Sequence, residues 1–195
     1  MREKPTSEHI VEAADQLFYE NGFEHTSFSD IANSVNVSRG NFYYHFKTKD
    51  EILSAVINLR LANTQAMLSQ WELASEDPVE RIRSFINLLV VNQAPIMQFG
   101  CPVGTLCTEL AKLSHASQKE AARLFALFGN WLTKQFEALG FGAEANTLAT
   151  HALVCSQGVA TLANAFGDER FVSQEVQQMH KWLDRAVAAQ NLSLV

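Results

Sequence analysis

The chain is poor in residues that break helices, crosslink small domains or span membranes. It contains four prolines and nine glycines in 195 residues, and this scarcity favours long helices. Its three cysteines are an odd number without the density of a disulfide scaffold, which fits a reducing cytoplasm. No run approaches the roughly 18 apolar residues typical of a membrane span, and we see no secretory signal. We therefore expect a cytoplasmic, all-α protein without a membrane segment.

Positive charge is also scarce. The chain has 15 Lys and Arg against 21 Asp and Glu, a net charge of −6, which argues against a protein that coats nucleic acid or anionic membranes by charge alone. Between Val37 and Lys49, however, there are three cations and no acidic residue. This segment can contact an anion locally. Repulsion from the acidic remainder means that specific contacts have to carry any binding to DNA.

The spacing of apolar residues predicts two helices at the start of the chain. A stripe between Ile10 and Phe18 lies on one face of a first helix, which is expected to end at Gly22 because glycine tolerates the left-handed conformation. Ser27 and Asp30 form a variant of the capping box and predict the start of a second, short helix.

The stretch SRGNFYYHFK predicts a third helix with two different faces. Ser38 is the expected N-cap, and the helix is expected to run to about Phe46. Phe42 and Phe46 share one face and are expected in a small core. The opposite face presents Arg39, Asn41, Tyr43, Tyr44 and His45. Two short helices joined by a tight turn, after a longer supporting helix, predict a helix-turn-helix unit.

The segment HTSFSDIANSVNVSRGNFYYHFKTKDEIL resembles the DNA-binding domain of TetR (tetracycline-repressor) family transcriptional regulators. The resemblance implies a helix-turn-helix DNA-binding domain over residues 1–48 and a helical effector-binding and dimerisation domain over residues 49–195. It further implies a regulator, usually a repressor, that binds a palindromic double-stranded DNA operator as a homodimer. A small molecule or a reactive electrophile would release such a regulator from DNA.

The resemblance also assigns roles to individual residues. Arg39 and Tyr44 are expected to contact base edges, and the guanidinium of Arg39 can donate a bidentate pair of hydrogen bonds to guanine. Gly40 is expected to let the helix approach the groove closely. Phosphates, which fix the register without specifying sequence, are expected to be held by the amides that follow Ser38 and by the side chains of Ser27, Asn41, Tyr43, His45 and Lys49.

Two apolar stripes with alternating spacings of three and four residues lie near the end of the chain. The first comprises Leu148, Ala152, Cys155, Val159, Leu162 and Phe166, and the second includes Val176, Met179 and Leu183. Such stripes suit antiparallel helix packing. The resemblance implies that these two helices form a four-helix interface with a second copy of the chain. A bundle core inside one chain is the alternative.

The middle of the chain is rich in aromatic residues. We expect two or three of them to line an effector cavity, and the candidates are Trp71, Phe99, Phe128 and Trp131. Pro102 suits the first position of a helix, so Cys101 is expected at the N-cap, where oriented amides favour a reactive sulfur. The segment QFGCPVGTLCTELAKLS resembles the corresponding segment of a TetR branch that responds to reactive electrophiles. The alternative for Cys101 is a small buried residue.

Two other classes of protein are weighed against the regulator. A cysteine-based enzyme would use His115 or His151, but the sequence has no recognisable nucleophile signature. A helical adaptor that has lost DNA binding is disfavoured by the polar face of the third helix. We expect no cofactor and no metal site, because Cys101 and Cys107 lie about 240° apart around a helix. The remaining two cysteines, Cys107 and Cys155, are expected to pack in the core.

Overall fold

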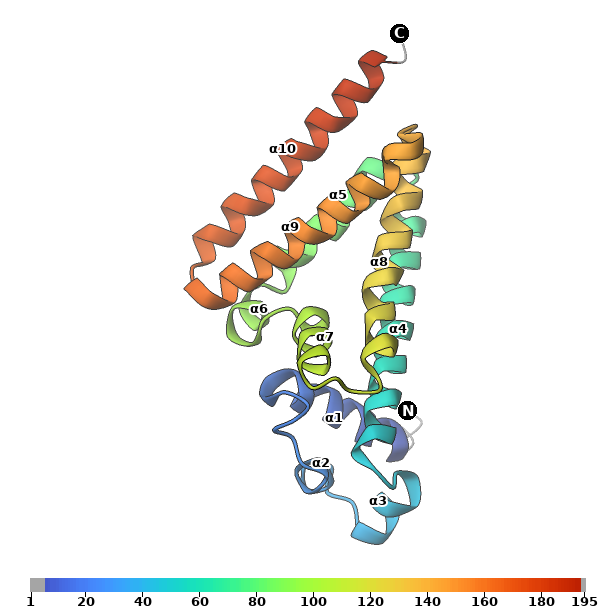
Figure 1. Ribbon diagram of the computed structural model, residues 1–195, viewed down its shortest axis with the longest axis vertical. Coiled ribbons are helices and arrows are strands. Elements are labelled where there is room, and N and C mark those ends of the chain that lie inside the picture. The colour runs from blue at the N-terminus through green and yellow to red at the C-terminus, as the bar shows by residue number, and fades with distance from the viewer. Residues whose placement is uncertain (1–5, 194–195) are drawn as a thin grey trace. The chain divides into compact units, whose positions relative to one another are not determined.

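The computed structural model describes residues 6–193, and over that range its regular structure is helical (Figure 1). The elements are α1 (Thr6–Asn21), α2 (Phe28–Ser34), α3 (Arg39–His45), α4 (Lys49–Ala74), α5 (Pro78–Val91), α6 (Gln93–Phe99), α7 (Pro102–Lys112), α8 (Gln118–Ala138), the 3-10 turn η1 (Gly142–Glu144), α9 (Ala145–Phe166) and α10 (Glu169–Ser193). The all-α class is confirmed. Within these described residues, no helix combines the length and apolarity needed to cross a bilayer.

The chain packs into two compact units. The first unit contains the chain up to Thr64 together with Pro102–Leu124, and the second contains Gln65–Cys101 and the residues from Phe125 onward. By packing, α7 therefore belongs with α1, α2 and α3. The predicted functional division into residues 1–48 and 49–195 stays a prediction.

The predicted helices of the first fifty residues are confirmed. Helix α1 ends at Asn21, and Gly22 has φ +85°. Ser27 caps α2 through a reciprocal pair of hydrogen bonds: its hydroxyl accepts from the amide of Asp30 at 3.1 Å, and its own amide donates to the Asp30 carboxylate at 2.8 Å. The hydroxyl of Ser38 accepts from the amide of Asn41 at 3.3 Å and starts α3.

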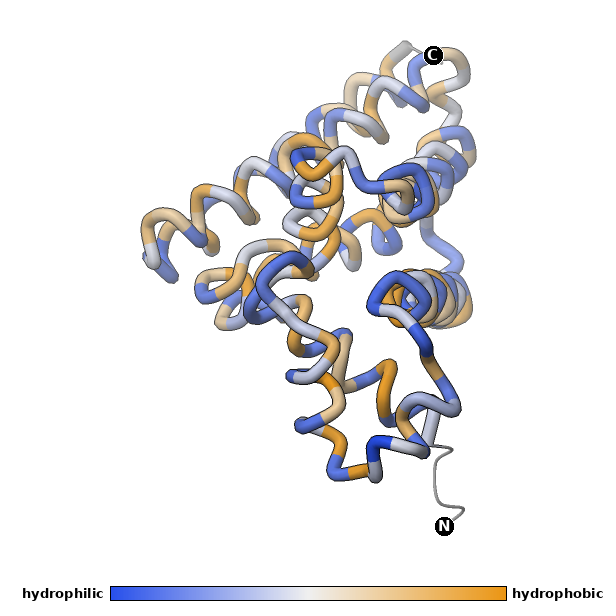
Figure 2. The backbone as a smooth tube through the Cα atoms, turned by 60° about the horizontal axis from the view of Figure 1, so that its bottom comes forward, coloured by the Kyte–Doolittle hydropathy of each residue, from blue (hydrophilic) through white to orange (hydrophobic). Residues whose placement is uncertain are grey.

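The core of the first unit draws on α7 as well as on the three N-terminal helices. Phe42 is fully buried and Phe46 packs against the core at its edge. Leu106 and Leu110 of α7 are buried in the same cluster, and burial of each such side chain is worth about 1.5–3 kcal/mol. Along the helices, hydrophobic and hydrophilic segments alternate, as amphipathic packing requires (Figure 2). The helix-turn-helix thus shares one core with α7.

The second unit is a bundle in which α10 packs on α5 and α9, and α6 packs on α9. The buried face of α9 is made mainly of small residues: Ala145, Ala149, Ala152, Ser156, Val159, Ala160 and Ala163. Small side chains let neighbouring helices approach closely. Asp77 caps α5, since its carboxylate accepts from the amide of Val79 at 2.8 Å, and Pro78 is the first residue of the helix.

Candidate nucleic-acid interface

The outward face of α3 combines charge, hydrogen-bonding groups and open space. Arg39 and Asn41 are exposed, and 77% of Tyr44 is accessible to solvent. A Cβ atom built on Gly40 would meet no atom within 4 Å. Behind this face Phe42 is fully buried and packs edge-on against Phe28, with ring centroids 4.9 Å apart. The buried Phe42 ring anchors the helix, and Arg39, Asn41 and Tyr44 remain accessible on its outer face.

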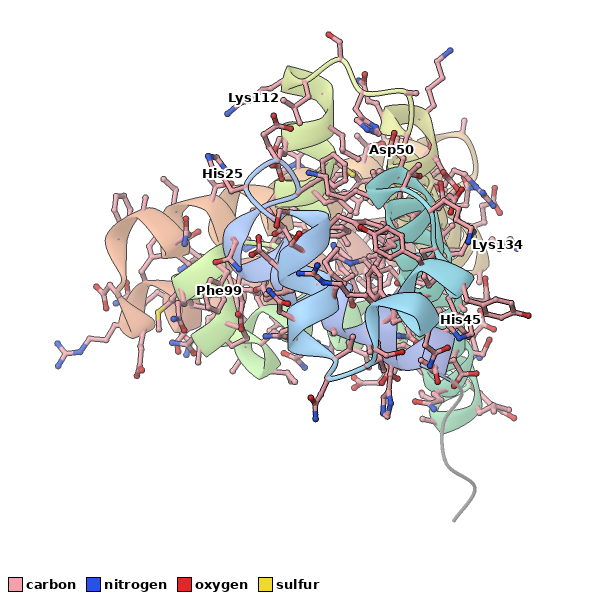
Figure 3. All side chains as sticks on the ribbon, turned by 90° about the horizontal axis from the view of Figure 1, so that it is seen from below. His25, His45, Asp50, Phe99, Lys112 and Lys134 are labelled. Carbon is pink, nitrogen blue, oxygen red and sulfur yellow. The ribbon has the colours of Figure 1, made fainter. Side chains whose placement is uncertain are left out.

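Two residues of this face are partly packed. The ring of Tyr43 is half exposed and lies 5.4 Å from that of Phe28, while its backbone carbonyl accepts a hydrogen bond from the Lys47 ammonium. His45, labelled on α3 in Figure 3, is half-buried with its ring 5.2 Å from that of Tyr44. Each ring therefore has an aromatic neighbour on one side and solvent on another.

Ser27 and Ser38 act first as helix caps. Both residues are exposed, and each hydroxyl oxygen accepts a backbone hydrogen bond within the chain. The Ser38 hydroxyl accepts through its oxygen, so it can still donate its proton to an external acceptor such as a phosphate. The hydrogen bonds from the side chain and the backbone amide of Ser27 lower the pKa of Asp30 below its ordinary value.

Lys49, predicted as a phosphate contact, binds the backbone of its own chain in this structure. Its ammonium donates to the carbonyl of Phe23 at 2.9 Å and lies 4.1 Å from the centre of the Phe23 ring. The side chain is half-buried at the first residue of α4. Because α4 begins against the turn between α1 and α2, the cation is occupied inside the first unit, and we omit it from the proposed DNA contacts.

The predicted effector residues lie on α4, α6 and α8, and two of them are in direct ring contact. In the second unit Trp71 and Trp131 have ring centroids 5.5 Å apart, and the indole N–H of Trp131 donates to the carboxylate of Glu72 at 2.8 Å. Phe128 is buried and packs against Phe85 at 5.6 Å. Phe99 is half-buried at the end of α6. The two tryptophans are thus brought together, and the two phenylalanines lie on different helices.

Helix α7 begins at Pro102, as predicted, so Cys101 is the residue just before its first turn. The Cys101 thiol is half-buried, and its sulfur accepts a hydrogen bond from the side-chain amide of Gln157 at 3.4 Å. Gly100, with φ +84°, is buried just before it. Cys107 packs at the edge of the first unit's core, as expected.

Cys155 lies in a groove and not in the interior core that the sequence suggests for it. It is half-buried, with its sulfur 3.4 Å from Nε2 of His151, one turn earlier on α9. Burial, together with the negative charge of Glu175, raises the pKa of this thiol. His115 instead accepts a hydrogen bond from the amide of Ser117 at 3.1 Å. No group of three His, Cys, Asp or Glu suited to a metal ion occurs among the residues that the structure describes.

The predicted dimer residues divide by exposure. Five are buried within the chain where α5, α9 and α10 pack together: Ala152 and Val159 on α9, and Val176, Met179 and Leu183 on α10. Leu148 and Cys155 are half-buried. Leu162 and Phe166 are exposed, as is Val154, which lies outside the predicted stripe. A groove of about 460 Å³ between α9 and α10 is lined by His151, Cys155, Gly158, Val159, Leu162, Phe171, Glu175, Gln178, Met179 and Trp182.

Comparison with known proteins agrees with both parts of this chain. Residues 10–56 match the family described as bacterial regulatory proteins, tetR family. Residues 78–178 match the C-terminal domain of LmrA/YxaF-like transcriptional regulators. The chain belongs to the TetR family of transcriptional regulators.

Relatives of this TetR-family chain are similar along most of its length. An uncharacterised HTH-type transcriptional regulator of Lactococcus lactis is 31% identical over 76% of this chain and 78% of its own length. The HTH-type transcriptional repressor DhaR of a Mycobacterium strain is 29% identical over 64% and 62% of the two chains. A TetR transcriptional regulator from Legionella pneumophila superposes with a TM-score of 0.82 at 26% identity, covering 95% of this chain and 99% of the other.

Proposed function

We propose that this TetR-family regulator is a repressor that binds a palindromic DNA operator as a homodimer and is released by a small molecule or a reactive electrophile. The observation that carries the proposal is the outward face of α3, where exposed Arg39 and Tyr44 flank the open position at Gly40. A helix with this face fits the major groove of DNA, which admits one α-helix.

Specificity and affinity come from different residues of the interface. Arg39 donates to guanine and Tyr44 contacts a neighbouring base edge. Phosphate contacts from Ser27, Ser38, Asn41, Tyr43 and His45 fix the register of α3 in the groove. Because the chain carries a net charge of −6, non-specific attraction is weak and operator binding falls steeply as salt increases.

A second copy of the chain would cover the exposed apolar residues of α9. Val154, Leu162 and Phe166 are exposed by 64%, 42% and 61%, and Leu162 also lines the groove between α9 and α10. In a symmetric dimer the two recognition helices enter successive major grooves about 34–36 Å apart. The repressor name of the relative DhaR supports the sign of regulation.

Release would follow from an effector that favours a dimer with a different separation of the recognition helices. Trp71, Phe99, Phe128 and Trp131 are the proposed aromatic contacts for a small molecule, and Cys101 is the proposed site of reaction with an electrophile. The names of the relatives favour a regulator over a cysteine-based enzyme.

The test replaces the two proposed base contacts. Arg39→Ala should cost about 1–3 kcal/mol of discrimination at one base pair of each half-site, because one bidentate contact is lost. Tyr44→Ala should relax a neighbouring position. Binding is measured by band shift on a duplex that the wild-type protein selects from a randomised library, and dimerisation by sedimentation. Both variants should remain dimers. Unchanged base preference in both would overturn the proposed interface.

A further inference from the structure

The turn between α1 and α2 is held by charged side chains from two sides. One carboxylate oxygen of Glu109, on α7, accepts from the amide of Phe23 at 2.9 Å, and the other accepts from the amide of Glu24 at 2.8 Å. Lys49, on α4, donates to the carbonyls of Phe23 and Glu24 at 2.9 and 3.5 Å. We refer to Glu109, Lys49 and the backbone of Phe23 and Glu24 as the turn clamp.

The charges of the turn clamp match the peptide groups that they contact. The carboxylate of Glu109 receives two N–H donors and the ammonium of Lys49 faces two carbonyl oxygens. Hydrogen bonds to an ionised group are roughly twice as strong as those between neutral groups. A cation near the C-terminus of α1 also complements the partial negative charge of that helix end. The two side chains therefore hold the N–H and the C=O groups of the same two residues, Phe23 and Glu24.

The local backbone is shaped for this contact. Gly22 has φ +85°, and a Cβ atom at this position would lie 3.0 Å from a Glu109 carboxylate oxygen. Phe23 is 3% exposed, and its ring packs against those of Phe18 and His115 with centroids 5.3 and 5.0 Å apart. A glycine lets the carboxylate reach the backbone, and the buried ring beside it holds the peptide groups in register.

A second polar contact joins α7 to α1. Arg60 of α4 is 9% exposed, and its guanidinium donates to the Asp15 carboxylate and to the carbonyl of Pro102, both at 2.5 Å. Asp15 lies on α1, and Pro102 is the first residue of α7. Arg60 thus connects the first residue of α7 to α1, and Glu109 connects α7 to the turn between α1 and α2.

We propose that Glu109 and Lys49 are positioning residues for DNA recognition. The clamped turn leads directly into α2 and α3, so its geometry sets where α3 presents Arg39 and Tyr44. The inference rests on the proposed function of that face in binding DNA. It also assigns Lys49 a role in orientation in place of a phosphate contact, and it makes α7 part of the unit that recognises the operator.

The test combines Glu109→Gln, Lys49→Met and the double variant in the full-length chain. The probe is the duplex that wild-type protein selects from a randomised library. Each single variant should bind it roughly tenfold more weakly, since a charge-assisted contact is lost. The double variant should lose little more than either single variant, because both changes release the same turn. The dependence of log affinity on log salt should keep its slope in Lys49→Met.

A phosphate role for Lys49 gives the opposite result. Its removal would reduce the salt slope by about one for each lost phosphate contact, and its effect would add to that of Glu109→Gln. Either outcome overturns the proposed clamp. Glu120→Gln is the matched control. It removes one negative charge from the same unit, as Glu109→Gln does, and the Glu120 carboxylate accepts from the Ser54 hydroxyl at 3.2 Å rather than from the turn. It should keep wild-type affinity.

Amide hydrogen exchange gives a readout that does not depend on DNA. Exchange at Phe23 and Glu24 should accelerate in Glu109→Gln at a temperature where circular dichroism shows the variant folded. Faster exchange with unchanged operator affinity would mean that the clamp does not position α3. If Arg39→Ala loses operator binding and Glu109→Gln does not, the proposed DNA-binding function is supported and the positioning role of the turn clamp is contradicted. If the wild-type protein selects no duplex, both fall.

Discussion

At the scale of single residues, α3 shows how one short helix serves two environments. Phe42 is fully buried, whereas Tyr44, two residues later, is 77% exposed. Burying a tyrosine hydroxyl or an imidazole requires a polar partner, so placing Tyr43, Tyr44 and His45 away from the core avoids three such requirements. The same arrangement makes their polar atoms available to bases and phosphates.

Cys101 can be tested as the site of electrophile sensing. Reaction of its sulfur with N-ethylmaleimide forms a C–S bond, transfers the thiol proton to the ring carbon and displaces the hydrogen bond from Gln157. We expect Cys101→Ser to bind the selected duplex normally but to resist release by one equivalent of the maleimide, as measured by band shift. Cys107→Ser and Cys155→Ser serve as controls that should still be released. Equal responses of Cys101→Ser and wild type would place sensing elsewhere.

The sequence predicts residue roles well where they depend on near neighbours. Both serine caps follow from spacings of three residues, and the structure confirms them. The role of Lys49 depends on Phe23, 26 positions away, and that of Glu109 on a contact 86 positions away. No local pattern encodes such pairs. A glutamate on an amphipathic helix gives no sign that it binds a distant backbone turn.

At the scale of elements, α5 and α10 are joined by a polar network around His180. Nε2 of His180 lies 2.9 Å from the side-chain oxygen of Asn87, and Nδ1 lies 3.3 Å from a guanidinium nitrogen of Arg83. Arg83 also pairs with Asp184 at 2.5 Å and with Glu80 at 3.2 Å. The arrangement suits a neutral imidazole that donates to Asn87 and accepts from Arg83.

This network predicts a dependence of stability on pH. Burial first, and Arg83 second, lower the pKa of His180 below its ordinary value of 6.5, against smaller opposing effects of Asp184 and Glu80. As pH falls below about 6.5, the unfolded chain takes up this proton before the folded chain does, so stability decreases until the folded pKa is passed. The urea midpoint should therefore fall more between pH 7.5 and 5 in wild type than in His180→Gln. Equal falls would contradict the assignment.

Helices are more predictable than the faces they bury. Local signals place α2, α3 and α7 correctly, because a capping residue or a proline marks where each helix begins. For α9, which carries both a stripe of larger apolar residues and a face of small ones, the structure buries mainly the small face. Which face of α9 is buried depends on how closely α5 and α10 pack against it. The spacing of residues within α9 does not predict that packing.

At the scale of the whole molecule, the proposed function depends on a second copy of the chain. One chain presents a single recognition helix, and a palindromic operator requires two at a fixed separation. The exposed apolar residues of α9 are the surface that we assign to this contact. Linking two half-site interactions raises the effective concentration of the second, so operator affinity should depend strongly on dimerisation.

Gly158 offers a direct test of that dependence. It is exposed in the middle of α9, and an added Cβ atom would meet nothing within 4 Å in its own chain. Replacing a helical glycine favours the helix by about 0.5–1 kcal/mol, so Gly158→Leu should leave the folded chain at least as stable. A bulky side chain would nevertheless hold a partner helix away. We expect sedimentation to show a monomer, with operator affinity reduced at least about tenfold as avidity is lost.

The exposed position Asn130 on α8 provides the matched control, since Asn130→Leu adds the same side chain to a different helix surface. This control should remain dimeric and keep operator affinity. A dimeric Gly158→Leu with wild-type operator affinity would show that the exposed face of α9 is not the contact between copies. A monomeric Gly158→Leu that still bound the full operator as tightly would separate DNA recognition from dimerisation. Reduced affinity together with a monomer ties the proposed recognition by α3 to the surface of α9.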